Sequence, residues 1–198
     1  VLIATGVYKA KKLSTEKEFL NVVPALDFLI ASNKKGLGDD VQLFDNGQLN
    51  AEGKDVVVIG GGDTAMDCVR TSIRQSAKSV KCLYTREVLN AEEEGVEFLW
   101  KSAPKDFIGN EYVSEVLCSR MQLSEPDASG RQLPEVIEGA DYNIKTDMVI
   151  TALGFDPEDI PKMFGVEELK VTKWGTLKTE FKSMMTDIEG VFAAGDIV

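Results

Sequence analysis

Five short, mostly apolar runs recur along the chain, and most of them end on glycine or lead directly into it. They cover residues 1–6, 55–59, 78–84, 147–154 and 190–196. Apolar runs of this length are typical of strands buried on both faces, as in a parallel sheet. The pattern predicts an α/β fold whose parallel sheet is built around 55–59 and 80–84, with helices on both faces.

Helical spacing and polar stretches fill the chain between these strands. Apolar residues recur at helical intervals over Pro24–Lys35 and Ala65–Ser76, which predicts a helix in each segment. The charged stretch Lys9–Glu18 is predicted to be an exposed connection, and the polar segment Gly36–Lys54 a loop. Downstream, turn residues alternate with short apolar pieces, which indicates a small antiparallel excursion near 116–146.

The run at 55–59 leads into a glycine-rich turn and then into the second predicted helix. The turn and the first residues after it are Gly60, Gly61, Gly62, Asp63, Thr64 and Ala65. Strand, glycine turn, helix and second strand in this order are typical of a dinucleotide-binding fingerprint. Gly60 permits the tight turn, Gly62 lets the backbone approach a pyrophosphate, and Ala65 allows close packing of helix on strand.

Backbone amides and the positive end of the helix dipole would then hold the phosphates. The alternative is structural: the glycines only make a tight turn, and Asp63 only caps the helix. Because all four parts of the fingerprint occur in register, we predict that these six residues bind a dinucleotide.

The end of the second strand decides which nicotinamide dinucleotide fits. A site for NAD places a carboxylate there to bind the ribose 2′-hydroxyl. Here the strand ends on Tyr84, followed by Thr85 and Arg86, and Lys81 lies within it. A guanidinium and a hydroxyl suit a 2′-phosphate, which a carboxylate would repel. This favours NADPH, but Glu87 follows at once, and a shift of one residue would favour NAD.

Composition removes several other chemistries. The chain has 198 residues, enough for one domain or for one domain with parts of another, and it has no histidine. It therefore has no Ser-His-Asp triad and no histidine-ligated zinc. A net charge of −11 argues against nucleic acid or an anionic membrane as a partner. No apolar run approaches the roughly 20 residues that span a bilayer, so a soluble protein is expected.

Cysteines and acidic residues offer no metal site. Cys68, Cys82 and Cys118 are widely spaced and form no CxxC, so neither an iron–sulfur cluster nor a disulfide framework is expected. Lone cysteines fit small buried side chains in a reducing compartment, and the cytoplasm is the expected location. The acidic run Glu92–Glu94 fits a solvated helix face better than a metal site.

Five segments together carry a family resemblance over nearly the whole chain. They are residues 1–10, 57–68, 91–97, 152–155 and 191–197. In this order they resemble the small (beta) subunit of bacterial glutamate synthase and related NADPH- and FAD-dependent flavoproteins of the pyridine nucleotide-disulfide oxidoreductase type. The resemblance implies a Rossmann-like NAD(P)-binding domain of the glutathione-reductase type, inserted between two stubs of an FAD domain.

The resemblance also implies domain boundaries and cofactor contacts. Residues 1–15 would be the end of an FAD-domain strand with a linker, 16–185 the NADPH-binding domain, and 186–198 the return strand of the FAD domain. The contacts implied with FAD involve Asp196 at the ribityl or pyrophosphate part and Thr5 with Gly6 near the flavin. Two further glycines at strand ends are candidates for cofactor binding, Gly154 and Gly195. No side chain is assigned a catalytic role, because the cofactors carry the reaction.

The sequence departs from the family pattern in two places. The family's amino-terminal FAD glycine motif, its cysteine-rich iron–sulfur segment and the helix after Asp196 are absent, so we expect a fragment that is inactive by itself. The segment after Tyr84 is also about ten residues shorter than in relatives. Arg86 then corresponds either to the arginine that binds the 2′-phosphate or to the one that ends the missing segment.

The function implied by the resemblance is hydride transfer from NADPH to FAD. Electrons would continue through iron–sulfur clusters outside this chain to the glutamate synthase large subunit, which makes glutamate from glutamine and 2-oxoglutarate. One alternative is an electron-input module of another reductase, such as a dihydropyrimidine dehydrogenase-like enzyme, and another is a non-catalytic nucleotide-binding or assembly module. A free-standing dehydrogenase that uses Tyr8 and Lys12 is disfavoured, because this pair precedes the glycine turn.

Overall fold

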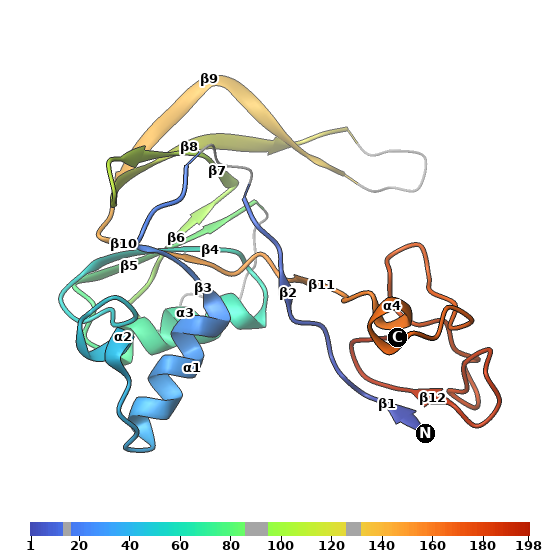
Figure 1. Ribbon diagram of the computed structural model, residues 1–198. Helices are drawn as coiled ribbons and strands as arrows, with labels where there is room; N and C mark the ends of the chain where they lie inside the picture. The colour runs from blue at the N-terminus through green and yellow to red at the C-terminus, as the bar shows by residue number, and fades with distance from the viewer. Residues whose placement is uncertain (14–16, 86–94, 126–131) are drawn as a thin grey trace. The chain divides into compact units, whose positions relative to one another are not determined.

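The computed structural model describes residues 1–13, 17–85, 95–125 and 132–198, which form two compact units (Figure 1). The larger unit is Lys12–Leu153, and the smaller one joins Val1–Lys11 to Gly154–Val198. The elements in chain order are β1 (Leu2–Ile3), β2 (Lys9–Ala10), β3 (Val22–Pro24), α1 (Ala25–Gly36), α2 (Gln42–Asp45), β4 (Asp55–Ile59), α3 (Asp63–Arg74), β5 (Ser79–Tyr84), β6 (Glu97–Trp100), β7 (Ser102–Gly109), β8 (Val113–Leu123), β9 (Pro134–Lys145), β10 (Met148–Thr151), β11 (Phe155–Asp156), α4 (Ile160–Phe164) and β12 (Phe192–Ala193).

A five-stranded parallel sheet forms the middle of the larger unit. Its strand order is β3-β10-β4-β5-β6, and every neighbouring pair is parallel. β4 and β5 are paired from Asp55 with Ser79 to Ile59 with Leu83. The parallel strands predicted at 55–59 and 80–84 are therefore confirmed.

Helices α1 and α3 cover one face of this sheet (Figure 1). Side chains alternate between the faces of a strand, so Val56 and Val58 of β4 lie in the core on the helix side, together with Phe28 of α1. Both helices lie within two residues of the segments where apolar spacing predicted them. They have 12 residues each, and no helix in the described part of the chain is long and apolar enough to cross a membrane.

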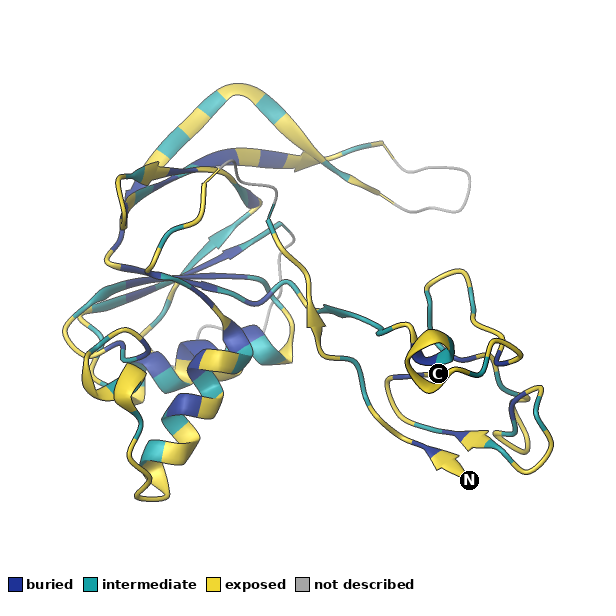
Figure 2. Ribbon diagram, viewed as in Figure 1, coloured by how far each residue is buried: buried dark blue, intermediate teal, exposed yellow. Residues whose placement is uncertain are grey.

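An antiparallel sheet of three strands, β7-β8-β9, packs on the opposite face. Val116 and Cys118 of β8 are fully buried in a core that also contains Val57 and Val149 of the parallel sheet. Figure 2 shows alternating buried and exposed bands along β8. This sheet confirms the predicted antiparallel excursion near 116–146 and extends it toward the amino terminus.

The expectation of helices on both faces is wrong for the described residues. One face of the parallel sheet carries a helix layer and the other a β layer. The physical reason is that an antiparallel strand with one apolar face, such as β8, buries a sheet face as well as an amphipathic helix does. Two predicted loops also contain short elements, since α2 lies within 36–54 and β2 within 9–18.

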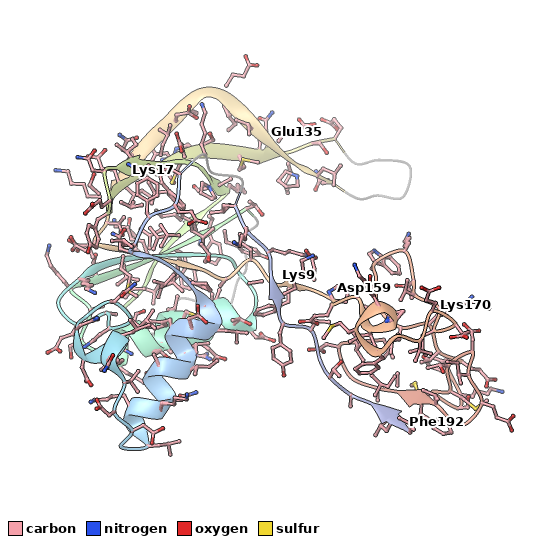
Figure 3. The ribbon with its side chains drawn as sticks, in the orientation of Figure 1. Lys9, Lys17, Glu135, Asp159, Lys170 and Phe192 are labelled. Carbon is pink, nitrogen blue, oxygen red and sulfur yellow. The ribbon has the colours of Figure 1, made fainter. Side chains whose placement is uncertain are left out.

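In the smaller unit, strands from Val1–Lys11 pair with strands from Gly154–Val198. β1 and β12 are parallel neighbours, with Leu2 opposite Phe192 and Ile3 opposite Ala193. β2 pairs with β11 in the antiparallel sense, and Phe192 lies on β12 at the surface (Figure 3). The core side chains are Ile3, Ile160, Leu169, Leu177, Ala193 and Ile197. The expectation that the strands before Gly6 and Asp196 lie side by side is confirmed.

The boundary between the units does not coincide with the domain boundary implied by the resemblance. Residues 154–185, grouped with the NADPH-binding domain in the sequence analysis, belong to the smaller unit. They do so because β11 pairs with β2, and because Ile160, Leu169 and Leu177 share a core with Ile3.

Candidate functional site

Gly60 directly follows β4 and has a backbone conformation that only glycine adopts easily. Its φ is +140°, and its amide donates to the carbonyl of Leu83 on β5 at 3.0 Å. A Cβ at this position would lie 2.2 Å from the carbonyl oxygen of Ala152, just after β10. The turn therefore lies between the ends of β5 and β10, and a side chain at position 60 would force these two segments apart.

Gly61 faces an aromatic ring. A Cβ at position 61 would lie 2.2–2.3 Å from Cγ, Cδ2 and Cε2 of Tyr84, the last residue of β5. The ring of Tyr84 in turn meets the ring of Trp100 on β6 edge to face, with centroids 6.4 Å apart. Position 61 therefore lacks a side chain because the Tyr84 ring fills that space.

Gly62 opens away from the protein. Among the described residues, no atom lies within 4 Å of the place where its Cβ would stand. Gly62 is the N-cap of α3, with an extended backbone and no side chain bonded to the helix terminus. Asp63 is therefore the first residue of the helix and not its cap. This open approach to a helix N-terminus is what a phosphate requires.

Several backbone amides at this end of α3 have no hydrogen-bond partner among the described residues. Ala65 and Met66 donate to the carbonyl of Gly62 at 2.9 and 3.2 Å. The amides of Gly61, Asp63 and Thr64 make no hydrogen bond with any described residue. Ala65 is fully buried in the core on the helix side, which keeps the start of α3 close to the sheet. The residues present thus fit a pyrophosphate cradle.

The cysteines near the turn are structural. The Cys82 thiol donates to the carbonyl of Gly60 at 3.2 Å, and the Cys68 thiol lies on α3. Burial raises the pKa of both thiols to about 12, so they stay protonated and unreactive near neutral pH. A thiol-based redox step has no support at this turn.

Beyond β5 the structure describes only part of the expected 2′-phosphate site. Thr85 follows the strand directly and is half-buried, whereas Arg86, Glu87 and the acidic run at 92–94 lie outside the described residues. The Lys81 ammonium lies 2.5 Å from the carboxylate of Glu97 on the neighbouring strand. The positive charge that the sequence analysis assigned to Lys81 is therefore already balanced within the sheet.

The residues implied to bind FAD meet in the smaller unit. Because β1 and β12 are parallel, Thr5 with Gly6 and Gly195 with Asp196 follow the same edge of this two-stranded pair. Gly6 and Gly195 have φ values of +70° and +83°, and Asp196 is exposed. Carboxyl ends of adjacent parallel strands are where ligands of α/β folds bind. Gly154, with φ of +84°, accepts a hydrogen bond from the Lys11 amide at 3.1 Å, in the same unit.

Sequence reasoning missed Tyr84, Trp100 and Ala152 as neighbours of the turn. One signal was present: Tyr84 and Trp100 each end a strand, and aromatic residues at the carboxyl ends of adjacent parallel strands come together. The contact of the Tyr84 ring with Gly61 and that of Ala152 with Gly60 join different elements, and no spacing along the chain records them. The fingerprint residues lie together at the carboxyl edge of the sheet, with Gly60–Gly62 in the turn and Asp63–Ala65 at the start of α3.

Comparison with known proteins agrees with this arrangement. The family model described as pyridine nucleotide-disulphide oxidoreductase matches residues 1–198. The chain is 56% identical to the glutamate synthase [NADPH] small chain of Azospirillum brasilense, with all of this chain and 43% of that protein aligned. It is also 56% identical to the putative glutamate synthase [NADPH] small chain of Cereibacter sphaeroides, covering 50% of that protein. The chain thus spans half or less of the length of these relatives.

One solved structure shows the fold at low sequence identity. Mycobacterium tuberculosis FprA in complex with NADPH superposes with a TM-score of 0.72 at 14% identity, over 99% of this chain and 57% of FprA.

The alignment with the Azospirillum protein extends over 209 positions against 198 residues here, so about 11 positions of that relative have no counterpart in this chain.

Proposed function

Because the chain belongs to the pyridine nucleotide-disulphide oxidoreductase family, we propose that its larger unit binds NADPH and that its smaller unit is part of an FAD-binding domain. The observation that carries the proposal is the open approach to α3 at Gly62, where no described atom would meet a Cβ. Nearby, backbone amides at the N-terminus of α3 have no partner among the described residues. A pyrophosphate held there gains several hydrogen bonds and the favourable end of the helix dipole.

The residues of the turn would bind and orient the nucleotide. Gly60 sets the direction of the turn, Gly62 lets the backbone come close to the phosphates, and Gly61, Asp63 and Thr64 contribute amides. The ribose 2′-phosphate would lie beyond β5, where Thr85 and Arg86 offer a hydroxyl and a guanidinium. When bound, NADPH supplies a hydride from its nicotinamide ring.

The smaller unit would contribute to FAD binding through residues at the ends of β1 and β12. Thr5, Gly6, Gly195 and Asp196 share that edge, and Gly154 lies in the same unit. A ribityl hydroxyl can donate to an exposed carboxylate such as that of Asp196. The positive φ values of Gly6 and Gly195 allow the backbone to turn close to a ligand.

For the whole protein we propose the small-chain role in glutamate synthase. The support is the 56% identity to two proteins of that name over the full length of this chain. Electrons from the flavin would pass through iron–sulfur clusters in other segments to a large subunit, which forms glutamate from glutamine and 2-oxoglutarate. The three described cysteines are free and buried, which fits a reducing compartment such as the cytoplasm.

A second candidate is an electron-input subunit of another reductase. The chain is 35% identical to the NADPH-Fe(3+) oxidoreductase subunit beta of Geobacter sulfurreducens, over 99% of its own length. The two candidates share the nucleotide site and differ in the acceptor. NADPH oxidation by the whole protein should be accelerated by a glutamate synthase large subunit with its substrates if the first is right, and by ferric iron alone if the second is right.

The nucleotide site is tested by the Gly62→Val variant. A valine side chain would project into the open space where the pyrophosphate is placed, so NADPH affinity should fall more than roughly tenfold, or about 1.4 kcal/mol. Titration calorimetry measures the loss. Gly36→Val is the matched control, because Gly36 is exposed at the end of α1 and a Cβ there also meets no described neighbour within 4 Å. Unchanged affinity in a folded Gly62→Val protein would remove the proposal.

A further inference from the structure

We propose that Tyr84 is a positioning residue of the dinucleotide site, because its ring occupies the space over Gly61 and thereby fixes the glycine turn in front of α3. The inference rests on the proposed nucleotide binding and adds a residue to it that no glycine pattern contains. In this arrangement Gly61, the middle glycine, serves packing within the protein, and the ligand approaches the backbone at Gly62.

The geometry separates these two roles. A Cβ on Gly61 would stand 2.2–2.3 Å from three ring carbons of Tyr84, well inside any real carbon–carbon contact. The atoms met are Cγ, Cδ2 and Cε2, so the body of the ring is involved and not the end of a flexible chain. Neither Gly61 nor Gly62 has a φ in the left-handed region. A side chain at position 61 is therefore excluded by the ring alone.

The Tyr84 ring on β5 is held in place by a row of two further rings, those of Trp100 and Phe98 on β6. Tyr84 and Trp100 are direct neighbours in the β5–β6 ladder. Their rings meet at 64°, with centroids 6.4 Å apart, and Trp100 stacks on Phe98 at 4.7 Å and 7°. Phe98 packs against the core on the helix side. Such ring pairs have preferred geometries, so the row fixes the position of Tyr84 from β6.

A Tyr84 ring fixed in this way limits where the backbone of the turn can lie. The turn is bounded on one side by the Ala152 carbonyl against Gly60 and on the other by the Tyr84 ring against Gly61. Gly62, next in the chain, meets neither. Removing the ring would let the turn relax toward β5 and move the free amides at the start of α3 away from the phosphates.

The first test measures NADPH affinity for Gly61→Ala in two backgrounds, Tyr84 and Tyr84→Ala. With Tyr84 present, the methyl group added at position 61 collides with the ring, and the affinity should fall by roughly tenfold or more. In the Tyr84→Ala background the same change should cost less than about twofold, because the ring is gone. Tyr84→Ala alone should weaken binding by about threefold to tenfold, whereas Tyr84→Phe, which keeps the ring, should match the wild type.

Gly62→Ala is the matched control in the same two backgrounds. Its Cβ meets no described atom, so whatever it costs arises at the ligand and should be the same with and without Tyr84. This contrast between adjacent glycines distinguishes a packing role from general damage to the turn.

The second test needs no ligand. The chain has two tryptophans, and Trp174 is 70% exposed in the smaller unit, so Trp174→Phe leaves Trp100 as the only reporter. In that background, Gly61→Ala should change the Trp100 emission because Tyr84 is displaced. Gly62→Ala and Tyr84→Phe should leave the emission unchanged.

The outcomes separate this inference from the function on which it rests. If the wild type binds neither NADPH nor NADH, the proposed function fails, and the positioning role fails with it. If the wild type binds but Gly61→Ala costs the same in both backgrounds, only the role of Tyr84 is overturned. The same holds if Gly61→Ala leaves the Trp100 emission unchanged.

Discussion

Three consecutive glycines meet three different physical demands at the end of β4. Gly60 needs a backbone conformation that other residues avoid, and the Ala152 carbonyl leaves no room for a Cβ there. Gly61 makes room for an aromatic ring, and Gly62 is open to solvent. The surroundings differ at each position, so substitutions at the three positions should fail for different reasons. A glycine motif therefore records several constraints that only the structure separates.

We expect the choice between NADPH and NADH to depend on single residues as well. Since Lys81 is paired with Glu97, Arg86 is the cation next to β5 that remains as the candidate for the 2′-phosphate. A charge-assisted hydrogen bond contributes about 1.5–3 kcal/mol, so Arg86→Ala should weaken NADPH binding roughly tenfold to hundredfold and leave NADH nearly unchanged. Calorimetric titration with both cofactors measures this difference.

Lys81→Ala is the control for this experiment, and its NADPH affinity should stay within about twofold of the wild type. Equal losses of NADPH and NADH affinity in Arg86→Ala would mean that Arg86 supports the fold only. A wild type that prefers NADH would mean that this arginine does not carry the 2′-phosphate preference.

At the scale of elements, the parallel sheet is sandwiched between unlike layers. Val116 of β8 is fully buried in the core shared with β4 and β10. Val116→Ala removes two buried carbon atoms and leaves a cavity, so the free energy of unfolding should fall by about 1.5–3 kcal/mol. Urea denaturation followed by circular dichroism measures it. Val136→Ala on β9, where the side chain is 54% exposed, should change it by less than about 0.5 kcal/mol. Equal effects would contradict the buried β layer.

Much of this architecture was predictable from local sequence patterns. The strands at 55–59 and 80–84, the helix between them and the glycine turn all follow from periodicity and turn chemistry within about 30 consecutive residues. The nature of the second layer was not predictable in this way. Alternating residues over 113–123 indicate a half-buried strand, but they do not say against which surface it packs.

The candidate site was predictable to a similar extent. The glycine turn with the start of α3, residues 60–65, is local and follows from spacing. The contact of Tyr84 with Gly61 joins different elements, and the Lys81–Glu97 pair joins two strands, so neither follows from spacing. The unit boundary near Gly154 depends on the pairing of β2 with β11, which are too short to be recognised from periodicity.

At the scale of the whole molecule, the two units differ in how well they cover their apolar side chains. Among the described residues, the smaller unit carries more of the exposed large hydrophobic side chains than the larger one. Leu2 lies opposite Phe192 in the β1–β12 pair, and Met185 bridges to Phe192 from the other side. Leu2 and Phe192 are both exposed, so they form part of an apolar surface patch.

This patch should bind a hydrophobic dye such as anilinonaphthalene sulfonate. Leu2→Ser should lower the dye fluorescence roughly twofold, because it places a polar side chain beside Phe192 in the apolar patch. Leu37→Ser is the control: Leu37 is 84% exposed after α1 in the larger unit, and its replacement should have little effect. A chain that binds no dye would contradict the patch.

The central claim is that the glycine turn and the start of α3 hold the phosphates of NADPH. Hydrogen–deuterium exchange with and without NADPH tests it most directly, because it locates protection along the backbone. We predict that NADPH slows exchange most strongly in peptides that cover residues 59–66, where the amides of Gly61, Asp63 and Thr64 have no described protein partner. Saturating NADPH that leaves exchange in these peptides unchanged, or protects other segments instead, would contradict the account.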